Sequence, residues 1–256
     1  TPVPRMPAVS VGVTICRLVP LPQTLATPPV IRRSTLTVLS VAPRSTVRRE
    51  FWRTWMVKDG LAQEEIMDAM LDRKGRLWVA TEDSGIDLVD GDKVVHFNAG
   101  SGLPSGVTYG LMLDRDDSMW AATAGGLVHF AGGRPVVYAK ASGLPDAPVF
   151  RAIQDAAGTV FVGTERGVYR REGERFVQVS RLLPVDGVPS LAKDAAGNLW
   201  VGTVNNGLLR LTQSGVEKFT SLRGLPNNRV AALLIDREGS VWAGTNAGLL
   251  RLSDEP

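Results

Sequence analysis

One stretch of this chain is written five times, and a repeat at this spacing constrains the fold more than any local feature does. The copies start at Gly60, Gly102, Gly143, Leu182 and Gly224, so successive starts are 42, 41, 39 and 42 residues apart. The last copy reads GLPNNRVAALLIDREGSVWAGT. Each unit is too short to bury a core alone, so we expect neighbouring units to pack on one another.

Three positions are nearly constant among the copies. Each copy has an Asp, then an aromatic residue six positions later and a Thr three positions after that. The Asp residues are Asp72, Asp114, Asp155, Asp194 and Asp236. The fourth residue of each Asp turn is Gly, except for Asp117. Asp first and Gly fourth predict a type I turn, in which the Asp side chain accepts hydrogen bonds from turn amides.

The unit that starts at Gly102 shows the expected structure of one repeat. Short apolar or β-branched runs cover residues 108–113, 119–123, 127–130 and 135–139, and short Asp- or Gly-rich turns separate them. This pattern predicts a four-stranded antiparallel meander. Several Gly and β-branched residues per unit, without an apolar stripe of 3.6-residue period, argue against a helical solenoid.

We therefore predict an all-β fold, a β-propeller of four-stranded antiparallel blades with five visible repeats. The residue two after each constant aromatic is small, which leaves room for the side chains of a neighbouring blade. These small residues are Ala80, Ala122, Gly163, Gly202 and Gly244. The apolar run Ala231–Ile235 is typical of a strand that is covered on both faces.

The last unit ends after its third strand. We expect the aromatic segment Phe51–Trp55 to supply the missing fourth strand and close a five-bladed ring, which would hide two sheet edges. The alternative is a larger ring with further repeats after Pro256. The chain begins with Thr rather than Met, so we expect a fragment or a processed product.

Residues 1–50 lie outside the repeat, and residues 51–256 form the expected propeller domain. The first segment holds eight of the sixteen prolines and has no aromatic residue, so we expect a disordered tail or a segment that is not native sequence. It also carries seven Arg against one Glu, whereas the repeat region has a small acidic excess. A nucleic-acid partner is therefore not expected. No apolar run is long enough for a membrane helix.

Few residues have the spacing of a catalytic or metal site. The five repeated Asp residues are explained by their turns, and His96 and His129 are single histidines in different blades, which favours structural roles. We expect no catalytic residue, no metal and no cofactor. There is no nucleophile elbow, phosphate loop or zinc-ligand spacing.

Positions that differ among the copies are the candidates for function. One is four residues before each turn Asp, on the innermost strand, and another is the loop after the constant Thr. We expect both to surround the mouth of a central channel. The candidate ligand-binding residues are Asp68, Glu82, Asp83, Arg151, Glu165, Arg166, Asn205, Asn206 and Asn246.

The order GLP, apolar strand, D-x-x-G-x-x-W-x-G-T and G-L-x-x-L resembles the two-component regulator propeller repeat over about residues 51–252. That resemblance implies an exported, usually periplasmic, sensor domain that precedes a β-sandwich, a membrane helix and a histidine kinase or diguanylate cyclase. Family rings usually have seven blades, whereas five are counted here, and this sequence contains none of the other parts. The resemblance supplies no ligand residues.

The sequence thus predicts a non-enzymatic sensor module that binds a small polar or saccharide ligand outside the cytoplasm. Two alternatives remain open at this point. One is a propeller enzyme similar to streptogramin lyase, which would need a histidine with an acidic or metal partner at the channel mouth. The other is a protein-interaction ring, which would carry a broad apolar patch on one face.

Overall fold

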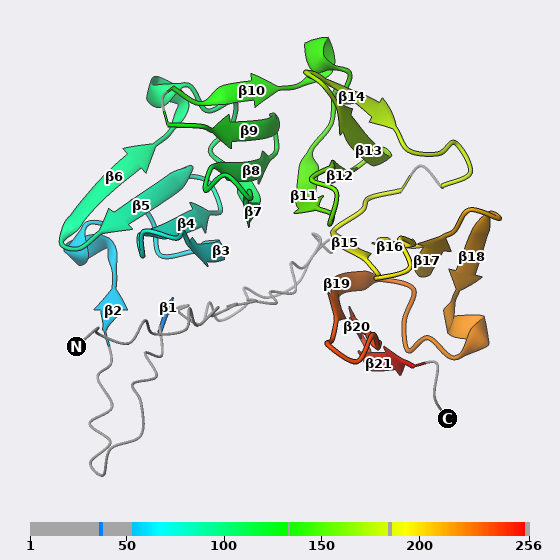
Figure 1. The fold of residues 1–256 in the computed structure, drawn as a ribbon. Helices are drawn as coiled ribbons and strands as arrows, with labels where there is room; N and C mark the ends of the chain where they lie inside the picture. Colours follow the sequence, from blue (N-terminus) through cyan, green and yellow to red (C-terminus); the bar gives the residue numbers. More distant parts are fainter. Residues whose placement is uncertain (1–35, 38–52, 133, 184–185, 254–256) are drawn as a thin grey trace, which may run out of the picture.

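The computed structural model describes residues 36–37, 53–132, 134–183 and 186–253. Five sheets follow one another along an arc around a common axis, with the first strand of each sheet on the inside (Figure 1). We call them blades 1 to 5. Blades 1 to 4 are four-stranded and antiparallel, and blade 5 has three described strands. The propeller architecture predicted from the repeat is confirmed.

The strand bounds follow the repeat closely. Blade 1 contains β3 (Ile66–Leu71), β4 (Leu77–Thr81), β5 (Ile86–Asp90) and β6 (Lys93–Phe97). Blade 2 contains β7 (Thr108–Leu113), β8 (Met119–Thr123), β9 (Gly126–Phe130) and β10 (Val136–Tyr138). Blade 3 contains β11 (Val149–Gln154), β12 (Val160–Thr164), β13 (Gly167–Glu172) and β14 (Arg175–Gln178). Blade 4 contains β15 (Ser190–Lys193), β16 (Leu199–Gly202), β17 (Leu208–Leu211) and β18 (Val216–Phe219). Blade 5 contains β19 (Val230–Ile235), β20 (Val241–Thr245) and β21 (Gly248–Leu252).

The expected closure of the ring by the N-terminal segment is wrong for the residues that can be placed. Thr54–Trp55 form β2, which pairs with β1 (Leu36–Thr37) and not with β21. The arc stays open between β21 and β2 in Figure 1. Phe51 and Trp52, and the rest of the 1–50 segment apart from β1, lie outside the described residues. The prediction of a disordered tail is therefore not tested.

Four of the five blades begin with a short connection that ends at the Gly-Leu pair of the repeat start. Single 3-10 turns at 57–59, 99–101, 140–142 and 221–223 end at Gly60, Gly102, Gly143 and Gly224, all with φ between 90° and 106°. Glycine adopts this left-handed conformation without the strain that a Cβ atom causes. The next residue is a buried Leu in all four. The copy before blade 4 has Leu182 in place of this Gly, and no 3-10 turn forms there.

The constant Asp closes the turn between the first two strands of every blade, as predicted. In four blades its carboxylate also accepts the indole N–H of the constant Trp, at 2.7–3.2 Å. Phe161 has no such N–H, and there Lys193 of the next blade donates to Asp155 at 2.6 Å instead. Gly75, Gly158, Gly197 and Gly239 have φ of 79–87° and Asp117 has φ of 69°, which is the left-handed exit expected at this place.

Neighbouring blades pack face to face through the predicted small residues. A Cβ atom added at Gly163 would lie 2.5 Å from the Val188 carbonyl oxygen of the next blade. A Cβ atom at Gly202 would lie 2.9 Å from the Val230 carbonyl oxygen in the same way. The faces of adjacent sheets are thus in close contact, and each buries the other's apolar side chains.

Blade 5 differs because no described sheet packs on its outer face. Leu249 is 62% exposed, whereas its equivalents in the other blades are 0% exposed. Those equivalents are Ile86, Leu127, Val168 and Leu208. Leu234, in the run expected to be covered on both faces, is 61% exposed for the same reason. The expectation of a doubly covered β19 is therefore wrong in this structure.

Leu208 and Leu249 therefore allow a matched pair of mutations that tests how much burial between blades stabilises the fold. Leu208→Ala removes a side chain buried between blades 4 and 5, so we expect it to lower the free energy of unfolding by about 2–5 kcal/mol. Leu249→Ala changes the same position of the repeat on an exposed face, and we expect a change of about 0.5 kcal/mol or less. Urea unfolding followed by tryptophan fluorescence measures both. Equal losses would show that Leu249 is covered in solution.

The turn carboxylates predict an acid-sensitive fold. Burial opposes ionisation of Asp72, Asp155 and Asp194, but turn amides and Trp, Arg, Asn or Lys side chains outweigh it and lower each pKa. A folded pKa below the unfolded value of about 3.9 adds stability above that value and loses it as the pH falls through the folded pKa. We expect the urea midpoint to decrease below about pH 4. Asp194→Asn should be less stable at pH 7 and show a smaller decrease on acidification.

Candidate functional site

The face that carries the loops after the constant Thr is the first part of the candidate site. In all five blades the Thr hydroxyl donates to the carbonyl of the glycine that starts the third strand, at 2.7–2.9 Å. A backbone N–H inside the loop donates back to the same hydroxyl oxygen in each blade. The constant Thr therefore fixes the backbone of this loop in every blade, although the loop is one residue longer in blades 1 and 4.

The inner-strand candidates Asp68 and Arg151 meet across three blades. Arg151 Nη1 in blade 3 lies 3.3 Å from Asp68 Oδ2 in blade 1. The same oxygen accepts the N–H of Leu111, on the inner strand of blade 2, at 2.9 Å. Gly110 lies between them, and a Cβ atom there would be 3.6 Å from Asp68 Oδ2. The sequence predicted that these positions line the axis, and the structure adds an ion pair that ties blades 1 to 3 together.

Burial controls the ionisation of Asp68. Its side chain is 9% exposed, and this burial raises the pKa of the carboxyl above its usual value. The positive charge of Arg151 and the N–H groups of Leu111 and Ala69 act in the opposite direction without cancelling the rise. The positive charge of Arg151 thus favours the ionised form of a carboxyl group that burial disfavours.

The corresponding residues of blades 4 and 5 are not charged. The Ser190 hydroxyl donates to the Val230 carbonyl at 3.1 Å and so links blade 4 to blade 5. Ala232 has no polar group. The polar side chains at this position therefore belong to blades 1, 3 and 4.

The loop candidates differ in how firmly they are held. Glu82, Asp83, Glu165, Arg166 and Asn246 are exposed on their loops. Asn205 and Asn206 both bond to the Asp186 carboxylate, with amide nitrogens at 3.2 and 2.9 Å, and Asn206 also accepts from Lys218. These two amides are therefore partly satisfied before any ligand arrives. The structure brings all seven to the same loop face, but not into one cluster.

Sequence reasoning missed an aromatic pair on the inner strands. Tyr109 and Phe150 lie at register shifts at the start of β7 and β11, and their rings meet edge to face with centroids 5.1 Å apart. A β-bulge places one extra residue on a strand and redirects its side chain. Burial and then the negative charge of Glu165 raise the pKa of Tyr109. An aromatic residue five positions before the turn Asp, in two copies only, was the available signal.

The two histidines of the chain lie away from the inner strands. His129, on the third strand of blade 2, stacks on Trp120 at 3.9 Å, and its Nε2 lies 2.7 Å from the Ser118 hydroxyl. Burial, then the charge of Arg171, lower its pKa. This is the structural role that the sequence favoured. His96, on the outermost strand of blade 1, pairs with a buried carboxylate that the sequence did not indicate.

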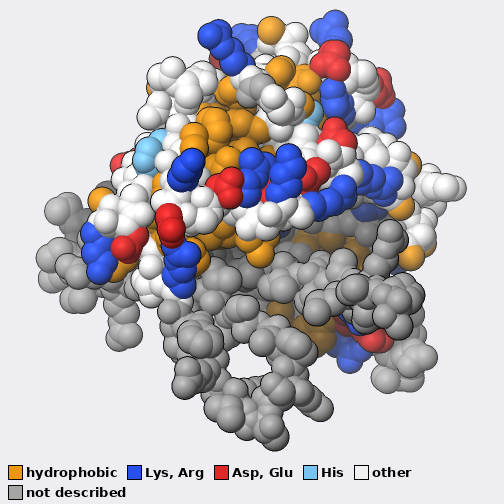
Figure 2. Space-filling view, turned by 60° about the vertical axis from the view of Figure 1, so that its left-hand side comes forward, with side chains coloured by type: hydrophobic (Ala, Val, Ile, Leu, Met, Phe, Trp, Pro, Cys, Tyr) orange, Lys and Arg blue, Asp and Glu red, His pale blue; other side chains and the backbone are white. Residues whose placement is uncertain are grey.

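The described residues contain no cluster of three or more His, Cys, Asp or Glu side chains placed to hold a metal ion. No helix among them is long and apolar enough to cross a membrane. Figure 2 shows apolar side chains gathered in the upper part of the face in view, with basic and acidic side chains interspersed beside and below them.

Comparison with known proteins supports the resemblance read from the residues. The family described as two component regulator propeller matches residues 182–205 and 224–247. The resemblance predicted from the residues is thus found in two of the five repeats. No curated protein matches the chain.

Solved structures share the fold at low sequence identity. The extracellular domain described as part of a hybrid two component system from B. thetaiotaomicron has a TM-score of 0.64 and 22% identity, over 77% of this chain and 28% of that one. A one component system from the same organism gives 0.64 and 20%, over 80% of this chain and 28% of that one. Virginiamycin B lyase from Staphylococcus aureus gives 0.58 and 13%, over 75% and 71%. The chain therefore spans little more than a quarter of the length of the two extracellular domains.

The Asp68–Arg151 pair changes one expectation about stability. From sequence alone, replacement of Arg151 should leave stability nearly unchanged. With the pair present, Arg151→Ala leaves a buried carboxylate without its cation, and we expect a loss of about 1–2 kcal/mol at pH 7.

The pH dependence separates this effect from lost packing. Because the folded pKa of Asp68 is already raised, removal of Arg151 raises it further, and the added loss of stability should shrink as the pH falls and the carboxyl protonates. Urea unfolding at pH 7 and near pH 4 measures the difference. The double variant Asp68→Asn with Arg151→Ala is the control and should show no such dependence. A loss that is equal at both pH values would contradict the electrostatic explanation.

Proposed function

Starting from a propeller in which two repeats match the two component regulator propeller family, we propose that this chain is the ligand-recognition module of a bacterial signal-transduction protein. In this proposal the module is not an enzyme, works in the periplasm or outside the cell, and binds a small polar or saccharide ligand at the channel mouth. A histidine kinase or diguanylate cyclase on the same protein would receive the signal. The fold similarity to extracellular domains of two component systems supports this class of function.

The proposal rests mainly on three side chains of blades 2 and 3, two from the inner strands and one from the loop after the constant Thr. The Tyr109 and Phe150 rings meet edge to face and form an apolar corner, and the negative charge of Glu165 acts on the Tyr109 hydroxyl. An apolar surface with a few polar groups is typical of a small-molecule site. None of these three residues is constant among the repeats, so the fold does not require them.

Signalling would follow from unequal binding to two arrangements of the module. A ligand shifts such an equilibrium only if it binds one arrangement more tightly than the other. Arg151 follows Phe150 in sequence, and its partner Asp68 also accepts the N–H of Leu111, so these contacts join blades 1 to 3. A ligand bound at the apolar corner formed by Tyr109 and Phe150 would therefore change the position of Arg151, and with it the ion pair between blades 1 and 3.

The lyase alternative has weaker support. A lyase of that type would need a histidine with an acidic or metal partner at the channel mouth, and the two histidines of this chain lie on a third and an outermost strand. The similarity to virginiamycin B lyase, at 13% identity, extends to the fold alone. An interaction ring is the remaining alternative, and a broad apolar patch on one face would favour it. Leu234 and Leu249 on the uncovered face of blade 5 are the side chains to test for such a contact.

Titration calorimetry with the purified chain and a panel of neutral mono- and disaccharides tests the proposal. Glu165→Gln keeps the shape of the side chain and removes its charge, so we expect about a tenfold weaker affinity for any saccharide that binds at the mouth, because hydrogen bonds to charged groups contribute more than neutral ones. Glu172→Gln is the control, since Glu172 is exposed on the β13–β14 hairpin. Both variants should melt at the same temperature as the parent. Equal affinities for all three proteins would contradict a site at the mouth.

A further inference from the structure

Blade 1 breaks the repeat at one core position. Asp87 on β5 occupies the place taken by Val128, Tyr169, Leu209 and Leu250 in the other blades. Val128 and Leu209 are fully buried apolar residues, and the Asp87 side chain is likewise 0% exposed. A carboxylate in such a place is unfavourable unless other groups hydrogen-bond to it. The fold does not need an acid here, since four other blades form without one.

Two groups hold this carboxylate. Its Oδ2 accepts the N–H of Ala62 at 2.8 Å, and its Oδ1 lies 2.7 Å from Nδ1 of His96, the residue directly opposite on β6. The residues opposite in blades 2, 3 and 4 are Val137, Gln178 and Lys218, so the pair occurs only in blade 1 among the four complete blades. A carboxylate bonded to Nδ1 fixes the ring orientation and places the proton on Nδ1, which leaves a lone pair on Nε2.

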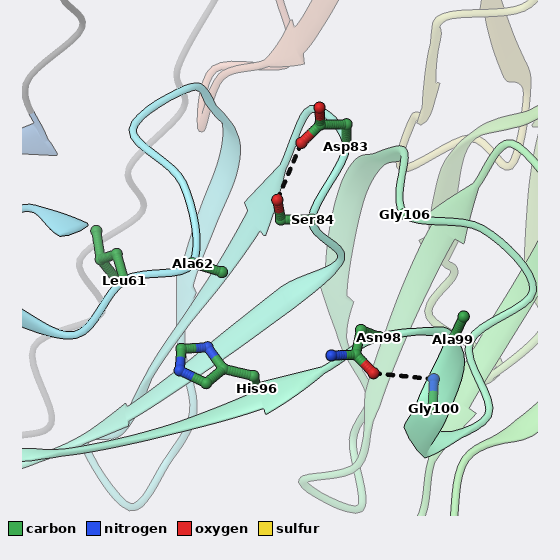
Figure 3. Close-up of a pocket in the computed structure, with 9 residues that line it drawn as sticks. All are labelled: Leu61, Ala62, Asp83, Ser84, His96, Asn98, Ala99, Gly100 and Gly106. Atoms are coloured by element: carbon green, nitrogen blue, oxygen red, sulfur yellow. Dashed lines mark hydrogen bonds between the residues drawn. The ribbon is translucent and has the colours of Figure 1, made fainter.

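The free edge of His96 borders a pocket of about 700 Å³. Leu61 and Ala62 form one side of it, and Asp83, Ser84 and Asn98 contribute polar groups (Figure 3). His96 is 43% exposed, and no described residue bonds to its Nε2. The pocket lies at the outer edge of blade 1 and shares only Asp83 with the candidate residues of the loop face.

Asn98 presents the complementary group. Its Oδ1 accepts the N–H of Gly100 at 2.9 Å, which fixes the amide so that Nδ2 is available as a donor. Figure 3 shows this nitrogen turned toward the side of the pocket on which His96 lies. On the opposite loop the Ser84 hydroxyl donates to Asp83 Oδ1 at 2.9 Å. The pocket thus offers an acceptor at His96, a donor at Asn98 and a carboxylate at Asp83, with no Lys or Arg in its lining.

We propose that this pocket binds a neutral, hydroxyl-rich small molecule, with His96 Nε2 accepting a hydrogen bond from one hydroxyl and Asn98 Nδ2 donating to a hydroxyl oxygen. A hydroxyl both donates and accepts, which matches this pair of groups. Leu61 and Ala62 suit the C–H face of such a ligand, and the lack of a cation in the lining disfavours an anion. Asp87 is a positioning residue that acts through the His96 ring. This site does not depend on the one proposed at the channel mouth.

The two histidines allow a direct test by NMR. In two-bond 1H–15N spectra of the 15N-labelled chain, His96 should show the tautomer protonated at Nδ1. D-Glucose, D-galactose, D-xylose and cellobiose are the probes, each titrated to high millimolar concentration. We expect at least one of them to shift the His96 signals saturably while those of His129, whose Nε2 is bonded to Ser118, stay in place. Sodium phosphate and sodium acetate are the anionic comparison.

Variants of Asp87 and His96 then test whether this pair is responsible for the binding that the NMR shift reports. Asp87→Val installs the blade 2 residue in blade 1, and we expect the dissociation constant of the active probe, measured by calorimetry, to rise at least tenfold. His96→Gln replaces a half-exposed ring and is the alternative variant if Asp87→Val does not fold. We expect it to raise the dissociation constant by the same factor. Asp90→Asn, at the exposed end of β5, is the control and should bind as the parent does.

Three results would overturn the proposal. One is that no probe moves His96 more than His129. Another is that phosphate or acetate moves His96 and the sugars do not, which would identify an anion site. The last is that His96→Gln and Asp87→Val both bind like the parent. Because Glu165→Gln leaves this pocket intact, a failure here is distinguishable from a failure of the site at the channel mouth.

Discussion

The fold depends on each blade covering the apolar face of its neighbour. A single four-stranded sheet in this chain has two apolar faces and can bury neither by itself. Leu208 and Leu249 occupy the same place in successive blades, yet one is fully buried and the other largely exposed, because a further sheet covers only the first. Burial at these positions is thus a property of the stack and not of the residue. Stability should therefore follow the contacts between neighbours, as in other repeat proteins.

Hydrogen bonds at the Asp turns hold the end of each blade, in some blades with a contribution from the neighbouring blade. The carboxylate bonds to turn amides and to the indole of the constant Trp, and an Arg lies over that indole in blades 2, 4 and 5. Blade 3 shows that the arrangement tolerates change: Phe161 replaces Trp, and Lys193 of blade 4 supplies both the hydrogen bond and the cation over the ring. With the constant residues engaged in this way, ligand chemistry is left to the positions that vary.

Those variable positions serve two different purposes. Asp68 and Arg151 vary among the copies because they form one contact across three blades, and such a contact cannot repeat in every blade. Tyr109, Phe150 and Glu165 vary without an evident structural need, and so do Asp87 and His96. Variation alone therefore does not identify a site. The contacts of each residue in the folded chain distinguish a residue that joins blades from one whose polar groups remain available to a ligand.

The sequence by itself determined the architecture, since the spacing of Asp, aromatic and Thr residues specified the turns, the strands of each blade and the small residues between blades. Those features are local or repeat from unit to unit, so one copy informs the next. Only the tertiary structure decided that Thr54–Trp55 pair with β1, that Asp68 meets Arg151, and that Asp87 orients His96. Each of these joins residues that occur once and lie far apart or on different strands, and no periodic pattern records which single residues meet.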